Sequence, residues 1–200
     1  MKELKILLLG AHHTGKTAFL NRIGNISGNN FADEYERTEG TTFRPIKFST
    51  STENVPEMVK LIFVDTDDQL GTIGATGDCD AAIVFHDVVT LREAISLGYM
   101  NSFHETYPGR PIINVLAFDD SIEYTVSSLE YIKSTCIGPF YVISSTNGWL
   151  RGPDFNQPIH VRVRYEKDLD LNPTQRVYLS YASSRPITEL LTHLLQLCNT

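Results

Sequence analysis

The stretch that decides the fold runs from Ile6 to Thr17 and reads ILLLGAHHTGKT. Its first four residues are an unbroken apolar run, which predicts a strand buried on both faces. Its last eight, Gly10–Thr17, fit the pattern G-x-x-x-x-G-K-[ST], and a helix is predicted over Lys16–Ile23. A glycine-rich turn between a strand and a helix directs backbone N–H groups and the positive end of the helix dipole at one point. The sequence therefore predicts a binding site for a nucleoside phosphate.

The residues of this phosphate loop, Gly10–Thr17, have expected roles. Gly10 and Gly15 permit backbone conformations and a close approach that a Cβ atom would obstruct. Lys16 is expected to reach the β- and γ-phosphates and to serve catalysis there, and the Thr17 hydroxyl is expected to ligate Mg²⁺. The predicted phosphate-binding set is Gly10, His12, His13, Thr14, Gly15, Lys16, Thr17 and Ala18.

Composition and charge restrict the class of protein. The chain has 200 residues, of which 42% are apolar, enough for one domain with a substantial core. A net charge of −7 argues against nonspecific binding of nucleic acid and against electrostatic docking on anionic membranes. Cys79, Cys136 and Cys198 are odd in number and lack metal-ligand spacing, which favours a reducing compartment. Cys198 is third from the end, which does not fit a prenylation box. We expect a soluble intracellular protein, cytoplasmic or nuclear, without a direct membrane anchor.

Apolar runs alternate with helical patterns along most of the chain. Strands are predicted over Lys5–Leu9, Phe43–Ser49, Val59–Val64, Ala81–His86, Ile112–Leu116 and Phe140–Ser144. Helices are predicted over Lys16–Ile23, Leu91–Tyr107, Tyr124–Thr135 and Ile187–Leu197. This alternation predicts an α/β fold with a mostly parallel central sheet and helices on both faces, in a single domain over residues 1–200. Ligands of such sheets bind outside the carboxyl ends of the strands, where the phosphate loop begins.

The stretch between Phe140 and Ser183 has a different character. Residues 146–153 are rich in Gly, Pro and Asn and predict a loop. The alternating run 159–165 and the run 176–181, separated by a polar turn, predict a β-hairpin. Arg162 and Arg164 share one face of this hairpin, which is either a solvated sheet edge or a surface for a partner.

Two further segments carry motifs. Arg37–Phe43 reads RTEGTTF, and Leu61–Thr66 reads LIFVDT and leads into Asp67–Gln69. Together with the phosphate loop, they resemble the switch segments of a Ras-superfamily small GTPase, closest to the Rab and Ran branches. The resemblance covers most of residues 4–147 and resumes over 176–198. It implies a G domain of the P-loop NTPase class that binds GTP or GDP with Mg²⁺.

The resemblance also implies roles for the switch residues. Thr38 would complete the Mg²⁺ shell and touch the γ-phosphate, with Thr41 and Thr42 as rivals for that role. Asp65 would hold Mg²⁺ through a water, and Gln69 would orient the attacking water as a catalytic residue. The implied metal site is therefore Thr17, Thr38 and Asp65.

Pro111–Asp120 reads PIINVLAFDD and resembles the strand that ends in the family's N-K-x-D motif for the base. Asp120 would accept hydrogen bonds from the guanine N1–H and exocyclic amine, with Asp119 as an alternative in register. Phe118 either stacks on the base or packs within its own loop. Ala117 stands where the family has an asparagine that braces the loop. Guanine preference would then rest on Asp120.

The family's last nucleotide motif, S-A-K, has two candidates. One is Ser145-Thr146-Asn147, which has the expected distance from Asp120. The other is Tyr181-Ala182-Ser183, which directly precedes the last helix. We favour the second, with Ala182 and Ser183 at the base, because that motif connects the last strand to the last helix. Residues from about 139 to 175 would then be an insertion.

The departures from the family pattern bear on activity. Asp68 stands in place of a glycine whose backbone contacts the γ-phosphate, and about 1 kcal/mol of charge repulsion there would lower triphosphate affinity several-fold. His12 would crowd the attacking water or donate to phosphate. We expect a small GTPase-like switch with slow GTP hydrolysis that acts through effectors, an exchange factor and a GTPase-activating protein. The alternative is a pseudo-GTPase, an interaction module that binds nucleotide weakly or without switching.

Overall fold

The structure is a computed structural model and describes residues 2–26, 40–49, 58–66, 73–86, 93–117, 134–144, 149–151, 185–186 and 188–199. In chain order, its elements are β1 (Glu3–Leu9), α1 (Lys16–Ile26), β2 (Thr41–Ser49), β3 (Met58–Thr66), the short 3₁₀ helix η2 (Gly74–Thr76), β4 (Ala81–Phe85), α2 (Glu93–Thr106), β5 (Ile112–Ala117), β6 (Phe140–Ser144), β7 (Trp149–Arg151), β8 (Arg185–Pro186) and α4 (Thr188–Leu197). None of the helices in these ranges is long and apolar enough to cross a membrane.

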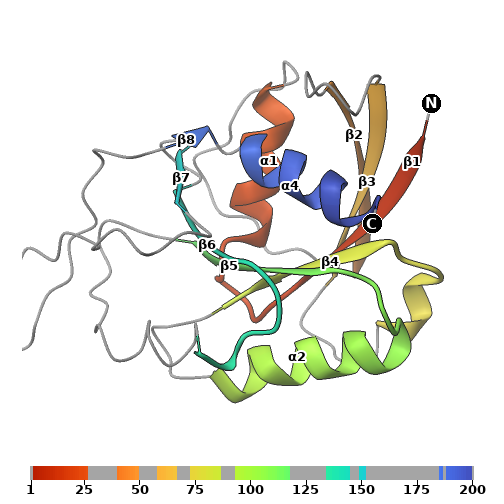
Figure 1. Ribbon diagram of the computed structural model, residues 1–200, viewed down its shortest axis with the longest axis vertical. Coiled ribbons are helices and arrows are strands. Elements are labelled where there is room, and N and C mark those ends of the chain that lie inside the picture. The colour runs from red at the N-terminus through yellow and green to blue at the C-terminus, as the bar shows by residue number, and fades with distance from the viewer. Residues whose placement is uncertain are drawn as a thin grey trace, which may run out of the picture.

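All of the described strands belong to one sheet, in the order β2-β3-β1-β4-β5-β6-β7-β8 (Figure 1). The five strands from β3 to β6 in this order are mutually parallel. β2 lies antiparallel to β3 at one edge, and β7 and β8 continue the other edge in antiparallel pairing. The chain is therefore an α/β protein whose central parallel strands all end at the same edge of the sheet, called here the carboxyl edge.

Helices cover both faces of the sheet, as the alternating pattern predicts (Figure 1). α1 and α4 lie on one face, where their apolar side chains join those of Ile6, Leu8 and Ile83 in one core cluster. α2 lies on the opposite face and packs through Tyr99, Met100 and Phe103 against Leu7, Leu9 and Val84. Because successive strand residues point to opposite faces, the unbroken apolar runs of β1 and β4 supply both clusters.

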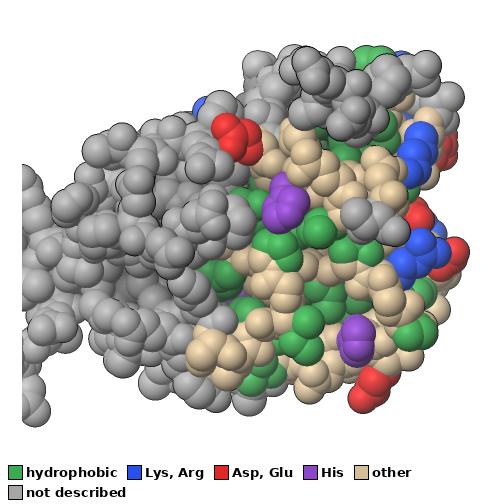
Figure 2. Space-filling model, viewed as in Figure 1, with side chains coloured by type: hydrophobic (Ala, Val, Ile, Leu, Met, Phe, Trp, Pro, Cys, Tyr) green, Lys and Arg blue, Asp and Glu red, His purple; other side chains and the backbone are tan. Residues whose placement is uncertain are grey.

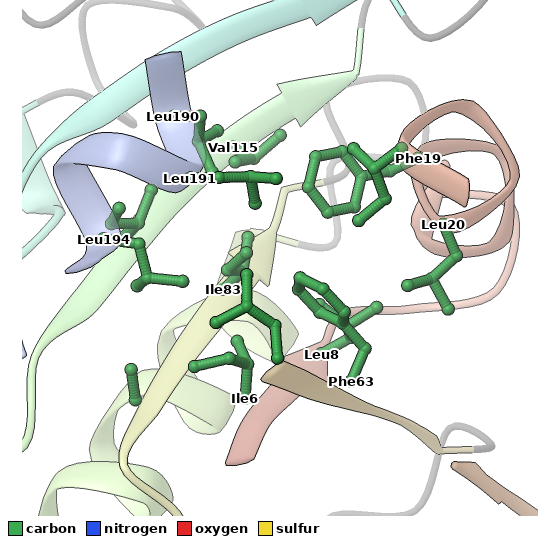
Figure 3. Close-up of a cluster of buried hydrophobic side chains, with 14 of the residues drawn as sticks. Ile6, Leu8, Phe19, Leu20, Phe63, Ile83, Val115, Leu190, Leu191 and Leu194 are labelled. Carbon is green, nitrogen blue, oxygen red and sulfur yellow. The ribbon is translucent and has the colours of Figure 1, made fainter. Parts of the chain in front are cut away.

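The cluster beneath α1 and α4 is dense in aromatic and branched side chains (Figure 3). Phe19 of α1 lies at the centre, with its ring edge-on to Phe63 at 6.2 Å and to Phe85 at 5.6 Å between centroids. Leu190, Leu191 and Leu194 of α4 approach from the side of β5. Phe19 is in the first turn of α1, so this packing fixes the start of the helix immediately after the phosphate loop.

Most predicted elements that fall on described residues are confirmed within a few residues at their ends. The six predicted strands correspond to β1–β6, and three of the predicted helices correspond to α1, α2 and α4. Of the predicted helix 124–135, only Ser134 and Thr135 lie in the described part, and both are helical. The hairpin predicted over 159–165 and 176–181, including Arg162 and Arg164, lies outside the described residues.

One prediction is wrong. Residues 146–153 were expected to form a loop, but Trp149–Arg151 form β7, antiparallel to β6. Trp149 and Leu150 suit a strand, and their backbone groups pair with Ser144 and Ile143 at what would otherwise be an open sheet edge. The strand has only three residues, and the Gly and Pro residues on either side of it led to the prediction of a loop.

The segment Ile73–Asp80 is fixed to the amino edge of the sheet. Lys5 Nζ donates to the Thr76 carbonyl at 2.8 Å, and Tyr107 Oη donates to the carbonyls of Ile73 and Gly77. The same Lys5 ammonium lies 5.8 Å from the centroid of the Phe43 ring of β2. Lys5 thereby joins β2 to the segment that follows residues 67–72, which contain the predicted second switch.

On the face in Figure 2, most of the described charged side chains, of both signs, lie along the right-hand side of the view. Where β1 pairs with β3, Lys60 Nζ lies 2.8 Å from Glu3 Oε1. Lys60 is half-buried and Glu3 is exposed, so solvent screens this ion pair and it contributes little to stability.

Candidate functional site

The phosphate loop leaves β1 at the carboxyl edge and leads into α1. Gly10 has φ 141°, and a Cβ atom added to it would lie 2.5 Å from the Phe85 carbonyl oxygen. Gly15 has φ 94°, and its added Cβ would lie 2.6 Å from the Ala117 Cβ. Both positions therefore require glycine for two reasons, a left-handed backbone and a close neighbour. The loop is held between the ends of β4 and β5.

The two histidines of the loop differ in their surroundings. His12 is half-buried, whereas His13 is exposed. His13 has φ 62°, a left-handed conformation that costs a residue with a Cβ roughly 1–2 kcal/mol. Such strain persists only where neighbouring structure imposes it and is concentrated at functional sites.

The Lys16 ammonium folds back over the loop. Lys16 is only 8% exposed, and its Nζ donates to the carbonyl oxygens of Gly10 at 2.5 Å and Ala11 at 3.0 Å. The Ala11 carbonyl also accepts from Thr14 Oγ1 at 2.8 Å. A buried cation beside the N-terminus of α1 makes this loop a strongly electropositive place, suited to an anion with several negative oxygens.

Thr17 and Asp65 meet across the carboxyl edge. Thr17 lies in the first turn of α1 and Asp65 near the end of β3, and Thr17 Oγ1 donates to Asp65 Oδ2 at 3.1 Å. Asp65 is 2% exposed. A hydroxyl and a buried carboxylate are hard oxygen ligands, and so they fit Mg²⁺. No three His, Cys, Asp or Glu side chains of the described ranges gather as a metal cluster.

The rival threonines of the first switch are strand residues. Thr41 and Thr42 are the first residues of β2 and are exposed. In the antiparallel pair with β3, Thr42 lies opposite Asp65 and Thr41 opposite Thr66. The β2 end of the first switch therefore reaches the same edge as Thr17. Ala18 lies in α1 and is half-buried.

Several predicted site residues lie outside the described part of the chain: Thr38, Asp68, Gln69, Phe118, Asp119, Asp120, the triplet 145–147, Ala182 and Ser183. The strand ends that precede two of these segments are described. β5 ends at Ala117, β6 ends at Ser144, and Ala117 pairs with Ile143 in parallel register. Both strands end at the carboxyl edge, and Ala117 at the end of β5 lies next to Gly15 of the phosphate loop.

Sequence reasoning missed a buried polar cluster between β4, β5 and β6, made of His86, Asn114 and Cys136. Asn114 Nδ2 donates to the Ile137 carbonyl at 2.8 Å, and this orients the amide so that its Oδ1 faces His86 Nε2 at 3.0 Å. Cys136 Sγ lies 3.4 Å from the same ring nitrogen. Asn114 lies 28 positions and Cys136 lies 50 positions after His86 in the sequence, so no local motif contains the three residues. The available signal was an asparagine inside the apolar run of β5.

This cluster is not a nucleophilic cysteine site. Because Asn114 Oδ1 can only accept, His86 Nε2 carries the ring proton and cannot take one from the Cys136 thiol. Burial raises the pKa of Cys136 to about 12, and burial lowers the pKa of His86 against the opposing effect of its bond to Asn114. The thiol stays protonated at neutral pH. The cluster instead ties β4 and β5 to the segment that leads into β6.

Comparison of the sequence with models of protein families and with curated proteins finds no match. The candidate site therefore stands on its geometry: a glycine-dependent loop, a buried lysine folded over it, and a threonine–aspartate pair beside it.

Proposed function

We propose that this chain is a guanine-nucleotide-binding switch protein of the small-GTPase type, with a P-loop NTPase G domain related to the Ras superfamily. The observation that carries the proposal is the loop between β1 and α1, in which the buried Lys16 ammonium lies over the loop carbonyls while Thr17 bonds to Asp65. A polyphosphate and a divalent cation are the ligands that match this combination of donors and charge.

The arrangement of the sheet supports the same proposal. In a parallel α/β sheet, a ligand binds outside the carboxyl ends of the strands. β1, β3, β5 and β6 all end at that edge, and the loops that follow them contain the phosphate loop, the second switch, and the two base segments after Ala117 and Ser144. Ala182 and Ser183, which precede the last helix, stay the favoured base contact of this proposal, and the triplet 145–147, which follows β6, stays its alternative.

Each residue of the proposed site would bind a different part of the nucleotide or its metal ion. Lys16 would bind the β- and γ-phosphates, and Thr17 with Asp65 would hold the metal, joined by Thr38. Mg²⁺, when bound, neutralises charge on the phosphate oxygens. Asp120 would select guanine, with Phe118 against the base.

Hydrolysis of GTP is proposed to be slow. Gln69 would orient the attacking water, whereas Asp68 adds a negative charge next to it and His12 reduces the space. The pseudo-GTPase remains the second candidate, because Asp68, Ala117 and Phe118 each replace a residue that the family uses for nucleotide. In either form, the chain would act through protein partners: effectors, and for a switch also an exchange factor and a GTPase-activating protein.

The proposal is tested first by what the purified protein carries. Denaturation followed by chromatography should release GDP or GTP in near-stoichiometric amount. Lys16→Ala should abolish this, whereas Lys47→Ala, an exposed lysine on β2, should not. An empty wild-type protein that also fails to bind added GDP, GTP or ATP in the presence of Mg²⁺ would overturn the proposal.

Hydrolysis separates the two candidates. In a single-turnover assay with GTP and Mg²⁺, a switch should show slow turnover that Gln69→Leu removes. Stoichiometric nucleotide without measurable turnover would favour the pseudo-GTPase instead.

A further inference from the structure

The two glycines of the phosphate loop touch the sheet in different ways. At Gly10, the nearest atom to an added Cβ is the backbone carbonyl oxygen of Phe85, at the end of β4. At Gly15, the neighbour is the side-chain Cβ of Ala117, at the end of β5. The Phe85 neighbour is a backbone atom, whereas the Ala117 neighbour is a side-chain atom, so a longer side chain at position 117 would add atoms next to Gly15.

Ala117 is held firmly on its own side of this contact. It is the last residue of β5, pairs in register with Ile143 of β6, and packs against the core cluster beneath α1 and α4. Gly15 is equally constrained, because its carbonyl accepts the first turn's bond from Phe19 N at 2.9 Å. Neither residue can give way without moving a strand end or the start of α1.

The next residues along each chain segment are those of the proposed site. Lys16 and Thr17 follow Gly15 directly, and the base segment 118–120 follows Ala117 directly. The Gly15–Ala117 contact therefore involves the residue directly before Lys16 and Thr17 and the last described residue before the proposed base segment.

We propose that Ala117 is a positioning residue, whose methyl group sets the place of Gly15 and through it the place of Lys16 and Thr17. This inference rests on the proposed function, which supplies the ligand. A larger side chain at position 117 overpacks the contact and displaces the loop, so phosphate binding weakens even though no group that touches phosphate has changed.

The test compares Ala117→Val with Ala82→Val. Ala82 is an equally small, fully buried residue of β4, but it belongs to the core beneath α2 and has no part in the site. Affinities are measured for GDP and for inorganic tripolyphosphate, each with Mg²⁺, at a temperature where both variants are folded. Ala117→Val should weaken both ligands about tenfold, whereas Ala82→Val should leave both unchanged and lower only the thermal midpoint.

Other outcomes overturn the inference. Loss of GDP affinity with unchanged tripolyphosphate affinity would mean that position 117 acts on the base segment alone. Unchanged affinity for both ligands would mean that Ala117 only packs. If Ala117→Val does not fold, Ala117→Ser, larger by one heavy atom, is measured in its place.

A wild-type protein that binds neither ligand would overturn the proposed function, and amide spectra then decide the positioning role separately. In ¹⁵N-labelled protein, the Gly15 and Lys16 amide signals should shift in Ala117→Val and stay in place in Ala82→Val. Signals that stay in place in both variants would remove the positioning role as well.

Discussion

At the scale of single residues, the phosphate loop stores strain at His13. Its φ of 62° suits glycine, yet a histidine occupies the position. The residue beside it, His12, is the same type but is not among the described residues with positive φ. The pair therefore compares one residue type in two backbone conformations, at a half-buried position (His12) and at an exposed one (His13).

His13→Gly is expected to raise the free energy of unfolding by about 0.5–1 kcal/mol. Relief of left-handed strain outweighs the extra backbone entropy of glycine in the unfolded chain. His12→Gly gains no such relief and is expected to lower the free energy of unfolding instead. Urea unfolding of both variants measures the difference. A His13→Gly variant no more stable than His12→Gly would show that this conformation carries no cost.

At the scale of elements, the polar groups buried on the α2 side of the sheet differ in how well their hydrogen bonds are satisfied. On the α2 side, the His86–Asn114–Cys136 cluster joins three segments with hydrogen bonds. On the same side, Ser96 of α2 is fully buried, and its Oγ has no hydrogen-bond partner among the described residues. The hydrogen-bonded cluster stabilises the packing of these segments, whereas burial of the Ser96 hydroxyl costs free energy.

Ser96→Ala is expected to stabilise the protein by about 1 kcal/mol. The substitution removes a buried hydroxyl whose desolvation free energy is not offset by a hydrogen bond. Alanine is also the better helix former. Thermal unfolding in parallel with Ser102→Ala, a half-buried serine of the same helix, isolates the effect of burial. A lower midpoint for Ser96→Ala than for the wild type would contradict this expectation.

The polar cluster should make stability depend on pH. Burial lowers the pKa of His86 in the folded protein, so the unfolded chain binds a proton more readily. Stability is therefore complete above the ordinary histidine pKa of about 6.5 and is lost as pH falls from there through the lower folded pKa. Burial also lowers the pKa of His193, which is hydrogen-bonded to Tyr141. Its protonation therefore also lowers stability as pH falls.

Urea unfolding at pH 7.5 and pH 5.5 measures this dependence. The difference in free energy between the two pH values should shrink in His86→Gln, which keeps a donor toward Asn114 but does not titrate. His104→Gln, an exposed histidine of α2, serves as the control. A pH dependence as large in His86→Gln as in the wild type would place its origin elsewhere.

At the scale of the whole molecule, contiguous sequence patterns predicted the secondary-structure elements well. Contacts between residues far apart in the chain could not be predicted. The apolar runs of β1 and β4 predicted strands covered on both faces. The phosphate loop could be predicted from Gly10–Thr17 because all residues of this motif are adjacent in the sequence. The strand order and the Gly15–Ala117 contact depend on residues far apart in the chain, which periodicity does not relate. β7 was missed because three residues are too few to show alternation against flanking Gly and Pro.

The carboxyl edge should also couple ligand binding to the stability of the entire sheet. Under the proposed function, a nucleotide would be held by the loop after β1 and by segments after β3, β5 and β6, and it would bind the folded chain and not the unfolded one. By mass action, Mg²⁺ and GDP at about 100 times the dissociation constant should raise the free energy of unfolding by about 2.7 kcal/mol. Unfolding followed by denaturant, with and without ligand, measures this rise, and ATP at the same concentration should give a smaller one. In Lys16→Ala the rise should vanish, because the buried ammonium is the principal cation of the loop. A rise of equal size in Lys16→Ala would show that the nucleotide binds away from Gly10–Thr17.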